Sequence, residues 1–324
     1  MVRVRGSDDA PGYAPRPVGT SQNATLRSTS TPPPVLDAQE NRPQPLTTQP
    51  VSRGTLDAIP TPEDIAAAQK KSAAAKQPSV AEIRAVWATM PGKKAVITPE
   101  ANGCRPVVVY LPPGFDPAKP ARLITAIHGH YGNVGAHLQK HGWLDRIRSL
   151  TEPEATPTPT DGLKPDSQII YVLPQANQPP FTYWMNPPES AAGLEKAALD
   201  AARLMAVGHE IDVVSRTVEA HSGAGIALAN AVAQGELHAD KINMLDATYG
   251  TWGARCVDYV IAERARGHDV HLESWYTRHQ EMKQHNDDMI AQAQQADLDG
   301  DVVKTHDVTA ETHDGVPPRH MGTP

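Results

Sequence analysis

Short β-branched runs alternate with helical stretches between residues 106 and 313. This alternation is typical of βαβ units, in which crossover helices pack on a mostly parallel sheet. The expected strands are 107–111, 123–127, 168–173, 217–220, 242–245, 271–276 and 308–312. The expected helices are 134–149, 190–207, 225–234, 253–266 and 280–296. The pattern predicts an α/β fold, a three-layer αβα sandwich around a mostly parallel, doubly wound sheet.

The chain before this pattern has a different composition. Residues 1–60 are rich in Pro, Ser, Thr, Gln and Asn and contain almost no aromatic positions. Such a segment buries too little apolar surface to offset the entropy lost on ordering, so we expect a disordered tail. Residues 61–104 predict a helical lead-in, since Ser79 and Glu82 have capping-box spacing. The catalytic domain is expected over residues 105–324.

Charge and cysteine content limit the classes of function. The formal net charge is −7 and no basic stripe occurs, so nucleic-acid binding is not expected. Cys104 and Cys256 favour two free thiols and supply no metal-ligand set, so no cofactor is expected. Neither an apolar run of about 18 residues for a membrane span nor a signal-peptide core is found. The sequence leaves localisation open between the cytosol, a virion and specialised secretion.

The segment Arg216–Gly225 is a β-prone run that ends at Ser222 and leads into an Ala-rich helical stretch. A nucleophile on a sharp strand-to-helix turn has strained backbone angles, and only small residues fit two positions before and after it. Ala220 and Ala224 are those residues here. Amides at the start of the following helix stabilise negative charge that develops during acyl transfer. Ser222 is the candidate nucleophile, and the Gly223 amide is a candidate oxyanion-hole donor.

A second segment, Leu123–Asn133, has the pattern of a buried strand that opens into a glycine-containing loop. Glycine after a strand lets the chain turn its amides inward. The His130 amide is the candidate for the second oxyanion-hole donor, with the Tyr131 amide as its substitute. His128 is a candidate for the substrate cleft, with a structural role as its alternative. Because no Asp or Glu lies at ligand spacing from these histidines, no metal site is predicted.

Three features in this order resemble the α/β-hydrolase superfamily over residues 105–313. They are Tyr110–Phe115, the strand end at His128–Gly129, and the turn Ala220–Gly225. The first is similar to the openings of esterase-D-like and polyester-depolymerase-like enzymes. The resemblance implies a serine hydrolase whose acid and then histidine follow the nucleophile along the chain.

The resemblance also implies that the histidine follows the last strand. His313 directly follows the expected strand 308–312, whereas His306 precedes that strand and would lie at the wrong end of the sheet. For the acid, Asp246 ends one expected strand and Glu281 follows the next. Asp246 is preferred, with a turn-capping role as its alternative.

These residues predict a serine hydrolase that cleaves an ester, in preference to an amide, through an acyl-enzyme. Two alternatives stay open. One is a non-catalytic binding or structural protein of a virion or secreted assembly, tethered to a protein partner through the tail. The other is a serine acyltransferase. Tyr183, Trp184 and Tyr249 are candidates for a cleft that takes a small-molecule or polymer ester, or for a cluster that covers the core.

Overall fold

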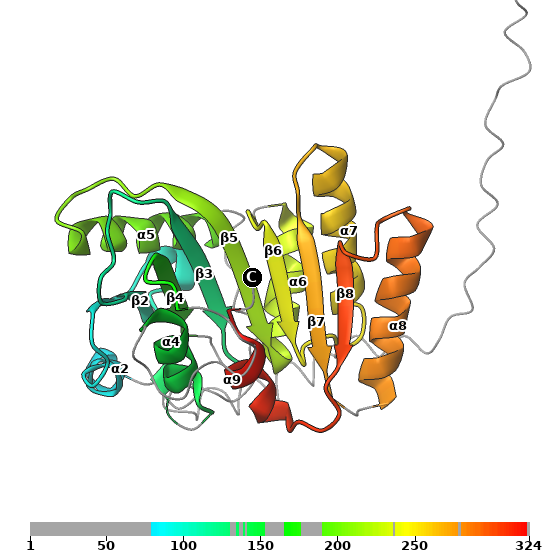
Figure 1. Ribbon diagram of the computed structural model, residues 1–324, viewed down its shortest axis with the longest axis horizontal. Helices are drawn as coiled ribbons and strands as arrows, with labels where there is room; N and C mark the ends of the chain where they lie inside the picture. Colours follow the sequence, from blue (N-terminus) through cyan, green and yellow to red (C-terminus); the bar gives the residue numbers. More distant parts are fainter. Residues whose placement is uncertain are drawn as a thin grey trace, which may run out of the picture. The chain divides into compact units, whose positions relative to one another are not determined.

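A computed structural model (Figure 1) describes the part of the chain that carries Ser222, Asp246 and His313. The described residues are 79–129, 134–135, 139, 141–152, 165–175, 190–235, 237–277 and 280–322. All of them fall within the compact unit formed by residues 54–324. The expected tail, residues 1–60, lies outside the described residues, so its disorder stays a prediction.

One eight-stranded sheet organises the described residues, in the order β1-β2-β4-β3-β5-β6-β7-β8. The strands are β1 (Lys93–Ile97), β2 (Val107–Leu111), β3 (Ala121–Ile127), β4 (Ile169–Pro174), β5 (Val213–His221), β6 (Lys241–Leu245), β7 (His271–Tyr276) and β8 (Val303–Asp307). β2 is antiparallel to β1 and β4, and the other neighbours are parallel. Because the carboxyl ends of parallel strands share one edge, the residues that follow β3, β5, β6, β7 and β8 are brought toward each other.

Helices cover both faces of the sheet (Figure 1). They are α2 (Val80–Trp87), α4 (Trp143–Thr151), α5 (Ser190–Met205), α6 (Gly225–Gln234), α7 (Trp252–Ala265), α8 (Gln280–Gln295) and α9 (Val316–His320). The short 3-10 turns are η1 (Glu100–Asn102), η3 (Ser222–Ala224) and η4 (His313–Gly315). Apolar residues of α5, α6, α7 and α8 join one core cluster, and those of α2, α4 and α9 join another. The predicted three-layer αβα sandwich is confirmed.

Strand β2 shows why the sheet is buried on both sides. Val107, Val109 and Leu111 belong to the first core cluster, whereas Val108 and Tyr110 belong to the second. Side chains of a strand alternate between faces, so a strand that is covered on both faces needs apolar residues at every position. This requirement explains the continuous β-branched run in the sequence.

Two strands differ from the sequence-based prediction. β1 lies within the segment expected to be a helical lead-in, and it pairs with β2 at an edge of the sheet. The last strand is β8 rather than 308–312, and it pairs with β7 from Val303 to Asp307. The strand ends there because the Asp307 carboxylate accepts a hydrogen bond from the Thr309 amide, at 3.1 Å, which starts a turn.

Helix starts follow local signals where the structure describes them. The predicted capping box at α2 is present, with the Glu82 amide 3.2 Å from Ser79 Oγ and the Ser79 amide 2.6 Å from Glu82 Oε2. The helix expected over 134–149 is interrupted, because residues 134, 135 and 139 are helical but a bend at 141–142 precedes α4, which begins at Trp143. Gly142 precedes it with a φ of +70°, a conformation that interrupts a helix and that glycine adopts readily.

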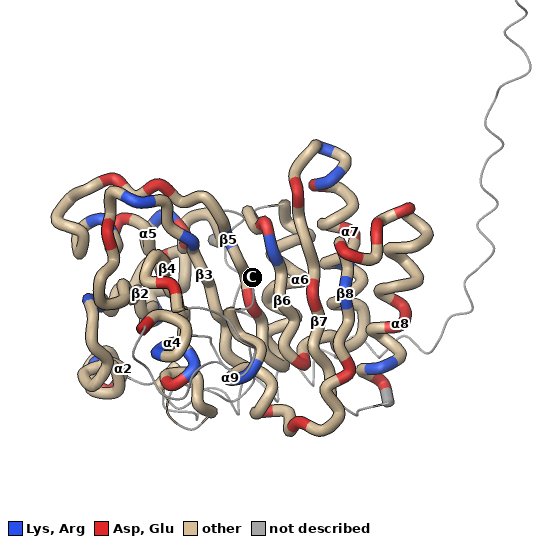
Figure 2. The backbone as a smooth tube through the Cα atoms, in the orientation of Figure 1, with Lys and Arg blue, Asp and Glu red and all other residues tan. Residues whose placement is uncertain are grey.

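Surface charge is mixed over the described elements. Figure 2 shows Lys and Arg interspersed with Asp and Glu along the strands and helices. Cys104 and Cys256 are both free thiols, as predicted. None of the helices in the described ranges combines the length and the apolar character that crossing a membrane requires.

Candidate active site

Strand β5 passes directly into η3 at Ser222, and α6 follows from Gly225. Ser222 has a φ of +54°, in the left-handed region that residues other than glycine seldom adopt. Such a conformation persists only where the surrounding structure holds it. Ala220 and Ala224, on either side, are fully buried, so larger side chains have no room there. Ser222 therefore lies on a strained strand-to-helix turn.

Two glycines allow the neighbouring chain segments to approach this turn closely. A Cβ atom added to Gly129, just after β3, would lie 2.9 Å from the Ser222 Cβ and 3.1 Å from His221 Nδ1. A Cβ atom added to Gly225 would lie 2.1 Å from the Ala247 carbonyl oxygen. The turn is thus packed between the carboxyl ends of β3 and β6.

The structure brings His313 and Asp246 together. His313 begins η4 and Asp246 follows β6, and His313 Nδ1 lies 2.6 Å from Asp246 Oδ2. Thr277 holds the same carboxylate, with its amide 2.9 Å from Oδ1 and its hydroxyl 2.8 Å from Oδ2. Burial alone would raise the pKa of Asp246, but the hydrogen bonds from His313 and Thr277 outweigh it and the pKa is lowered. Since an ionised carboxylate only accepts, Nδ1 of His313 donates and Nε2 keeps the lone pair.

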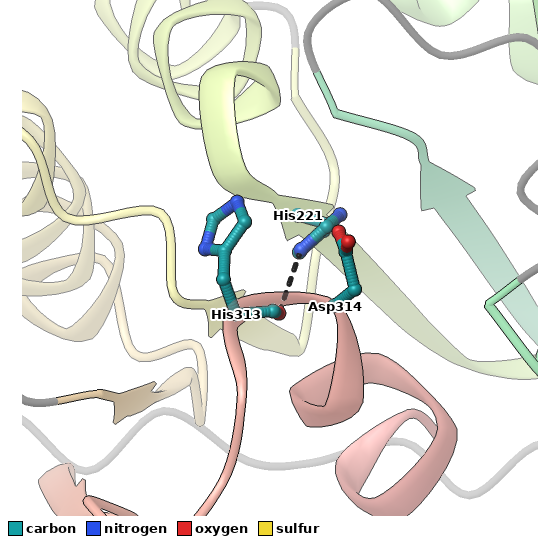
Figure 3. Close-up of side chains that lie close together, drawn as sticks. All are labelled: His221, His313 and Asp314. Carbon is teal, nitrogen blue, oxygen red and sulfur yellow. Dashed lines mark hydrogen bonds between the residues drawn. The ribbon is translucent and has the colours of Figure 1, made fainter.

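His221 connects this pair to the Ser222 turn. Its Nε2 donates to the main-chain carbonyl oxygen of His313 at 3.2 Å (Figure 3). The two imidazole rings lie 4.7 Å apart between centroids. Burial, and then the charge on His313, lowers the pKa of His221 to about 3. A neutral ring next to the nucleophile candidate therefore fixes the backbone of the segment that carries His313.

Tyr249 lies near the Ser222 side chain. Burial raises the pKa of the Tyr249 hydroxyl, the Asp246 charge raises it further, and a hydrogen bond with the Ser222 side chain lowers it. Its ring packs edge-on against Trp252, with centroids 5.5 Å apart. This position suits the predicted cleft role of Tyr249.

The other predicted site residues have different outcomes. Gly223 is buried within η3. His128 is only 1% exposed and donates from Nδ1 to the Gly129 carbonyl at 2.9 Å, so it lines no open cleft and fits the structural alternative. The predicted positions His130, Tyr131, Tyr183 and Trp184 lie outside the described residues.

Both competitors of the preferred histidine and acid lie elsewhere. His306 was expected to precede the last strand, but it lies within β8, with its ring stacked on Trp275 at 4.8 Å. Its Nε2 is 3.4 Å from Glu273. Glu281 is exposed in the first turn of α8. The structure thus brings only Asp246, of the two candidate acids, into hydrogen-bonding contact with His313 among the described residues.

Sequence reasoning missed two residues of this site, Thr277 and His221. Thr277 follows β7, and the parallel register pairs Leu245 with Trp275, so a correct strand alignment would have placed it beside Asp246. No sequence pattern points to His221, because the atom it contacts is the backbone carbonyl oxygen of His313, 92 residues further along the chain.

Hydrogen bonds hold residues 321 and 322, which follow His313, against β5 and α4. The Gly322 amide donates to Glu219 Oε1 at 2.7 Å, and Arg146 Nε donates to the Met321 carbonyl at 2.8 Å. Asn243 Nδ2 also donates to Glu219, at 2.9 Å. Burial raises the pKa of Glu219, although these hydrogen bonds oppose the shift. Strand β5 therefore leads into Ser222 and also carries the Glu219 carboxyl group, which anchors the end of the described chain.

The two buried histidines predict a loss of stability in mild acid. Burial lowers the pKa of His128 to about 4 and that of His221 to about 3, from an ordinary value of 6.5. Between these values the unfolded chain binds protons that the folded chain does not, so the free energy of unfolding falls as the pH decreases from 6.5 toward 4. Each histidine lowers the free energy of unfolding by at most about 1.4 kcal/mol per pH unit of acidification. Glu219 has the opposite effect, because its raised pKa lets the folded chain bind one proton that the unfolded chain does not.

Urea unfolding at intervals between pH 7.5 and pH 5 measures this effect. In a His128→Gln variant, the pH dependence of the free energy of unfolding should be smaller by about one proton. A free energy of unfolding that stays constant or rises on acidification through this interval would contradict the prediction.

Comparisons with known proteins concern the fold. No family model and no curated relative matches the sequence. Similar solved structures include the fluorophosphonate-binding serine hydrolase F of Staphylococcus aureus, with 12% identity and a TM-score of 0.42 over 67% of this chain and 90% of that chain. The S-formylglutathione hydrolase of the same organism has 13% identity and a TM-score of 0.46 over 67% of this chain and 88% of that chain. An IroE-like serine hydrolase from Shewanella oneidensis has 13% identity and a TM-score of 0.43 over 71% and 77%.

The fold can be identified from the order and direction of the strands. The sheet has a single order across eight strands, an antiparallel β2, parallel neighbours from β4 to β8, and helices on both faces. A strained serine follows the fifth strand and begins the turn into a helix. The chain therefore has the α/β-hydrolase fold that its sequence resembles.

Proposed function

We propose that the protein is a serine hydrolase that cleaves esters through an acyl-enzyme formed on Ser222. One observation carries the proposal, the 2.6 Å hydrogen bond between His313 Nδ1 and Asp246 Oδ2 at the sheet edge where Ser222 begins its turn. Chain order adds support, because Ser222, Asp246 and His313 follow the order nucleophile, acid, histidine.

Each residue has a defined chemical task in this proposal. As the Ser222 oxygen attacks the ester carbonyl carbon, His313 Nε2 takes the hydroxyl proton. The ionised Asp246 stabilises the imidazolium and keeps the ring in the required tautomer. His313 then gives the proton to the departing alcohol, and water, activated by the same imidazole, releases the acid and restores Ser222.

The oxyanion of the tetrahedral intermediate needs two donors. The Gly223 amide, at the start of η3 and ahead of α6, is one candidate, since helix amides near an N-terminus favour negative charge. The amide of His130, or of Tyr131 in its place, remains the proposed second donor. Gly129 supports this choice, because it packs against Ser222 and directly precedes His130, which Tyr131 follows.

Electrostatic cost favours the enzyme over a non-catalytic binding protein of the same fold. Asp246 is 2% exposed and ionised, and burying a charge is expensive unless it is paired. The side chain of its partner His313 is 40% exposed. The pair therefore holds an imidazole that solvent can reach, rather than one packed in the core. This arrangement is the one that a general base uses.

Covalent labelling tests the proposal. The folded protein is treated with a fluorophosphonate probe, digested, and analysed by mass spectrometry, with heat-denatured protein as the control. We expect one adduct, on Ser222, that denaturation abolishes, together with turnover of short p-nitrophenyl esters. Labelling on a different serine would refute the nucleophile assignment, and neither labelling nor turnover would favour the binding-protein alternative.

A further inference from the structure

Three side chains of metal-ligand type gather at the edge of the site (Figure 3). They are His221 from the end of β5, and His313 and Asp314 from η4. One ring nitrogen from each histidine and one carboxylate oxygen of Asp314 all lie within 4.8 Å of one another. This group could not be recognised from the sequence, because His221 lies 92 residues before His313 along the chain.

Hydrogen bonding fixes which nitrogens keep a lone pair. A carbonyl oxygen can only accept, so His221 donates from Nε2 to the His313 carbonyl and its lone pair lies on Nδ1. His313 donates from Nδ1 to Asp246, so its lone pair lies on Nε2. In their neutral forms these two imidazoles, together with the Asp314 carboxylate, provide three electron-pair donors. Nitrogen and oxygen donors of these kinds suit zinc and related divalent transition metals.

We propose that His221, His313 and Asp314 form a binding site for a zinc-class divalent cation, and that the bound ion inhibits the enzyme.

The spacing requires only a small adjustment. Zinc holds such ligands at about 2.0–2.2 Å, so tetrahedral ligand atoms lie roughly 3.3 Å apart. The widest pair of the present group, at up to 4.8 Å, would close by roughly 1.5 Å. His221 is buried and fixed, but the Asp314 side chain is 56% exposed and the His313 side chain 40% exposed. Rotation of these two side chains can supply the movement, and the ion can reach them from solvent.

One neighbouring group bears on the affinity. His141 Nδ1 lies 3.5 Å from Asp314 Oδ2. This contact competes with the ion for the Asp314 carboxylate. The remaining zinc position is left to water.

Inhibition, unlike binding, rests on the proposed function. In that function the lone pair of His313 Nε2 accepts the Ser222 proton, and a metal ion bound to it blocks the transfer. Zinc should therefore reduce ester turnover.

The binding test uses a variant that does not depend on activity. Ser222→Ala protein without a histidine tag is titrated with Zn²⁺ by calorimetry, and Co²⁺ is added in parallel to record the visible absorption of a low-symmetry site. We expect one site whose Kd rises about tenfold or more in the Ser222→Ala/Asp314→Asn double variant. Asp288→Asn, which alters an exposed acid on α8, is the matched control and should leave Kd unchanged. Absence of binding, or equal loss in both double variants, overturns the site.

The activity test uses the wild-type protein and the single variants. Zn²⁺ should inhibit ester turnover of wild type and of Asp288→Asn, and Asp314→Asn should need about tenfold more metal for the same inhibition. Binding without inhibition overturns the inhibitory role. Binding by Ser222→Ala together with a wild type that neither turns over esters nor labels on Ser222 would support the metal site and refute the proposed function, so the two failures are distinguishable.

Discussion

His313→Ala is expected to lower kcat/KM for a p-nitrophenyl ester by about 10⁴-fold or more. The variant loses the group that takes the Ser222 proton, and no other described histidine contacts Asp246. It also leaves the buried Asp246 carboxylate without its main partner, although both Thr277 hydrogen bonds remain. Steady-state kinetics measure the effect, and circular dichroism checks that the variant is folded.

His306→Ala is the matched control for this prediction. Both residues are histidines near the carboxyl end of the sheet, but His306 lies in β8 against Trp275 and Glu273. It should keep most of the wild-type turnover. If a folded His313→Ala protein retained more than about a tenth of wild-type kcat/KM, or if both variants lost activity equally, His313 would not be the general base.

Gly225→Ala is expected to lower the free energy of unfolding by about 3 kcal/mol or more. The new methyl carbon would lie 2.1 Å from the Ala247 carbonyl oxygen and 2.7 Å from Trp252 Cε3. A backbone oxygen cannot rotate aside, so either α6 or the segment after β6 must shift. Asp246 directly precedes Ala247, and the shift should therefore reduce ester turnover as well. Urea unfolding gives the loss of stability.

Gly300→Ala provides the comparison. A Cβ atom at Gly300 would meet no other atom within 4 Å, and the residue is exposed. The substitution should change the free energy of unfolding by no more than about 0.5 kcal/mol. Similar losses in the two variants would show that contact with Ala247 is not what requires glycine at position 225.

The sequence predicted the parts of the fold that one pattern determines. The bounds of β2, β7 and α6 agree with the predicted ranges. β2 is an apolar run buried on both faces and α6 is an Ala-rich helix, and both patterns give unambiguous signals. β1 was missed because it is an edge strand, and its two lysines and partial exposure hide the pattern. β8 was misplaced because Val308 and the threonines near it have high β propensity, whereas the actual strand includes Lys304, His306 and Asp307.

The candidate site was predictable where chain order and strand ends locate it. Asp246 and His313 were chosen for their positions after strands, and the structure brings them into contact, although His313 follows its strand by six residues rather than one. Contacts between side chains and the backbone of distant segments could not be predicted. The contact of His221 with the His313 carbonyl and the resulting group with Asp314 depend on how η4 folds back over β5.

The anchoring of the chain by Glu219 affects how mutational surveys of this protein should be interpreted. Substitutions at Glu219 or Arg146 would release residues 321 and 322, which continue from the helix that follows His313. A survey that records only product formation would then count these positions as part of the chemistry, although neither one touches the reacting groups. Pairing each rate with a melting temperature separates the two kinds of position, because loss of an anchor lowers both values and loss of a reacting group lowers only the rate.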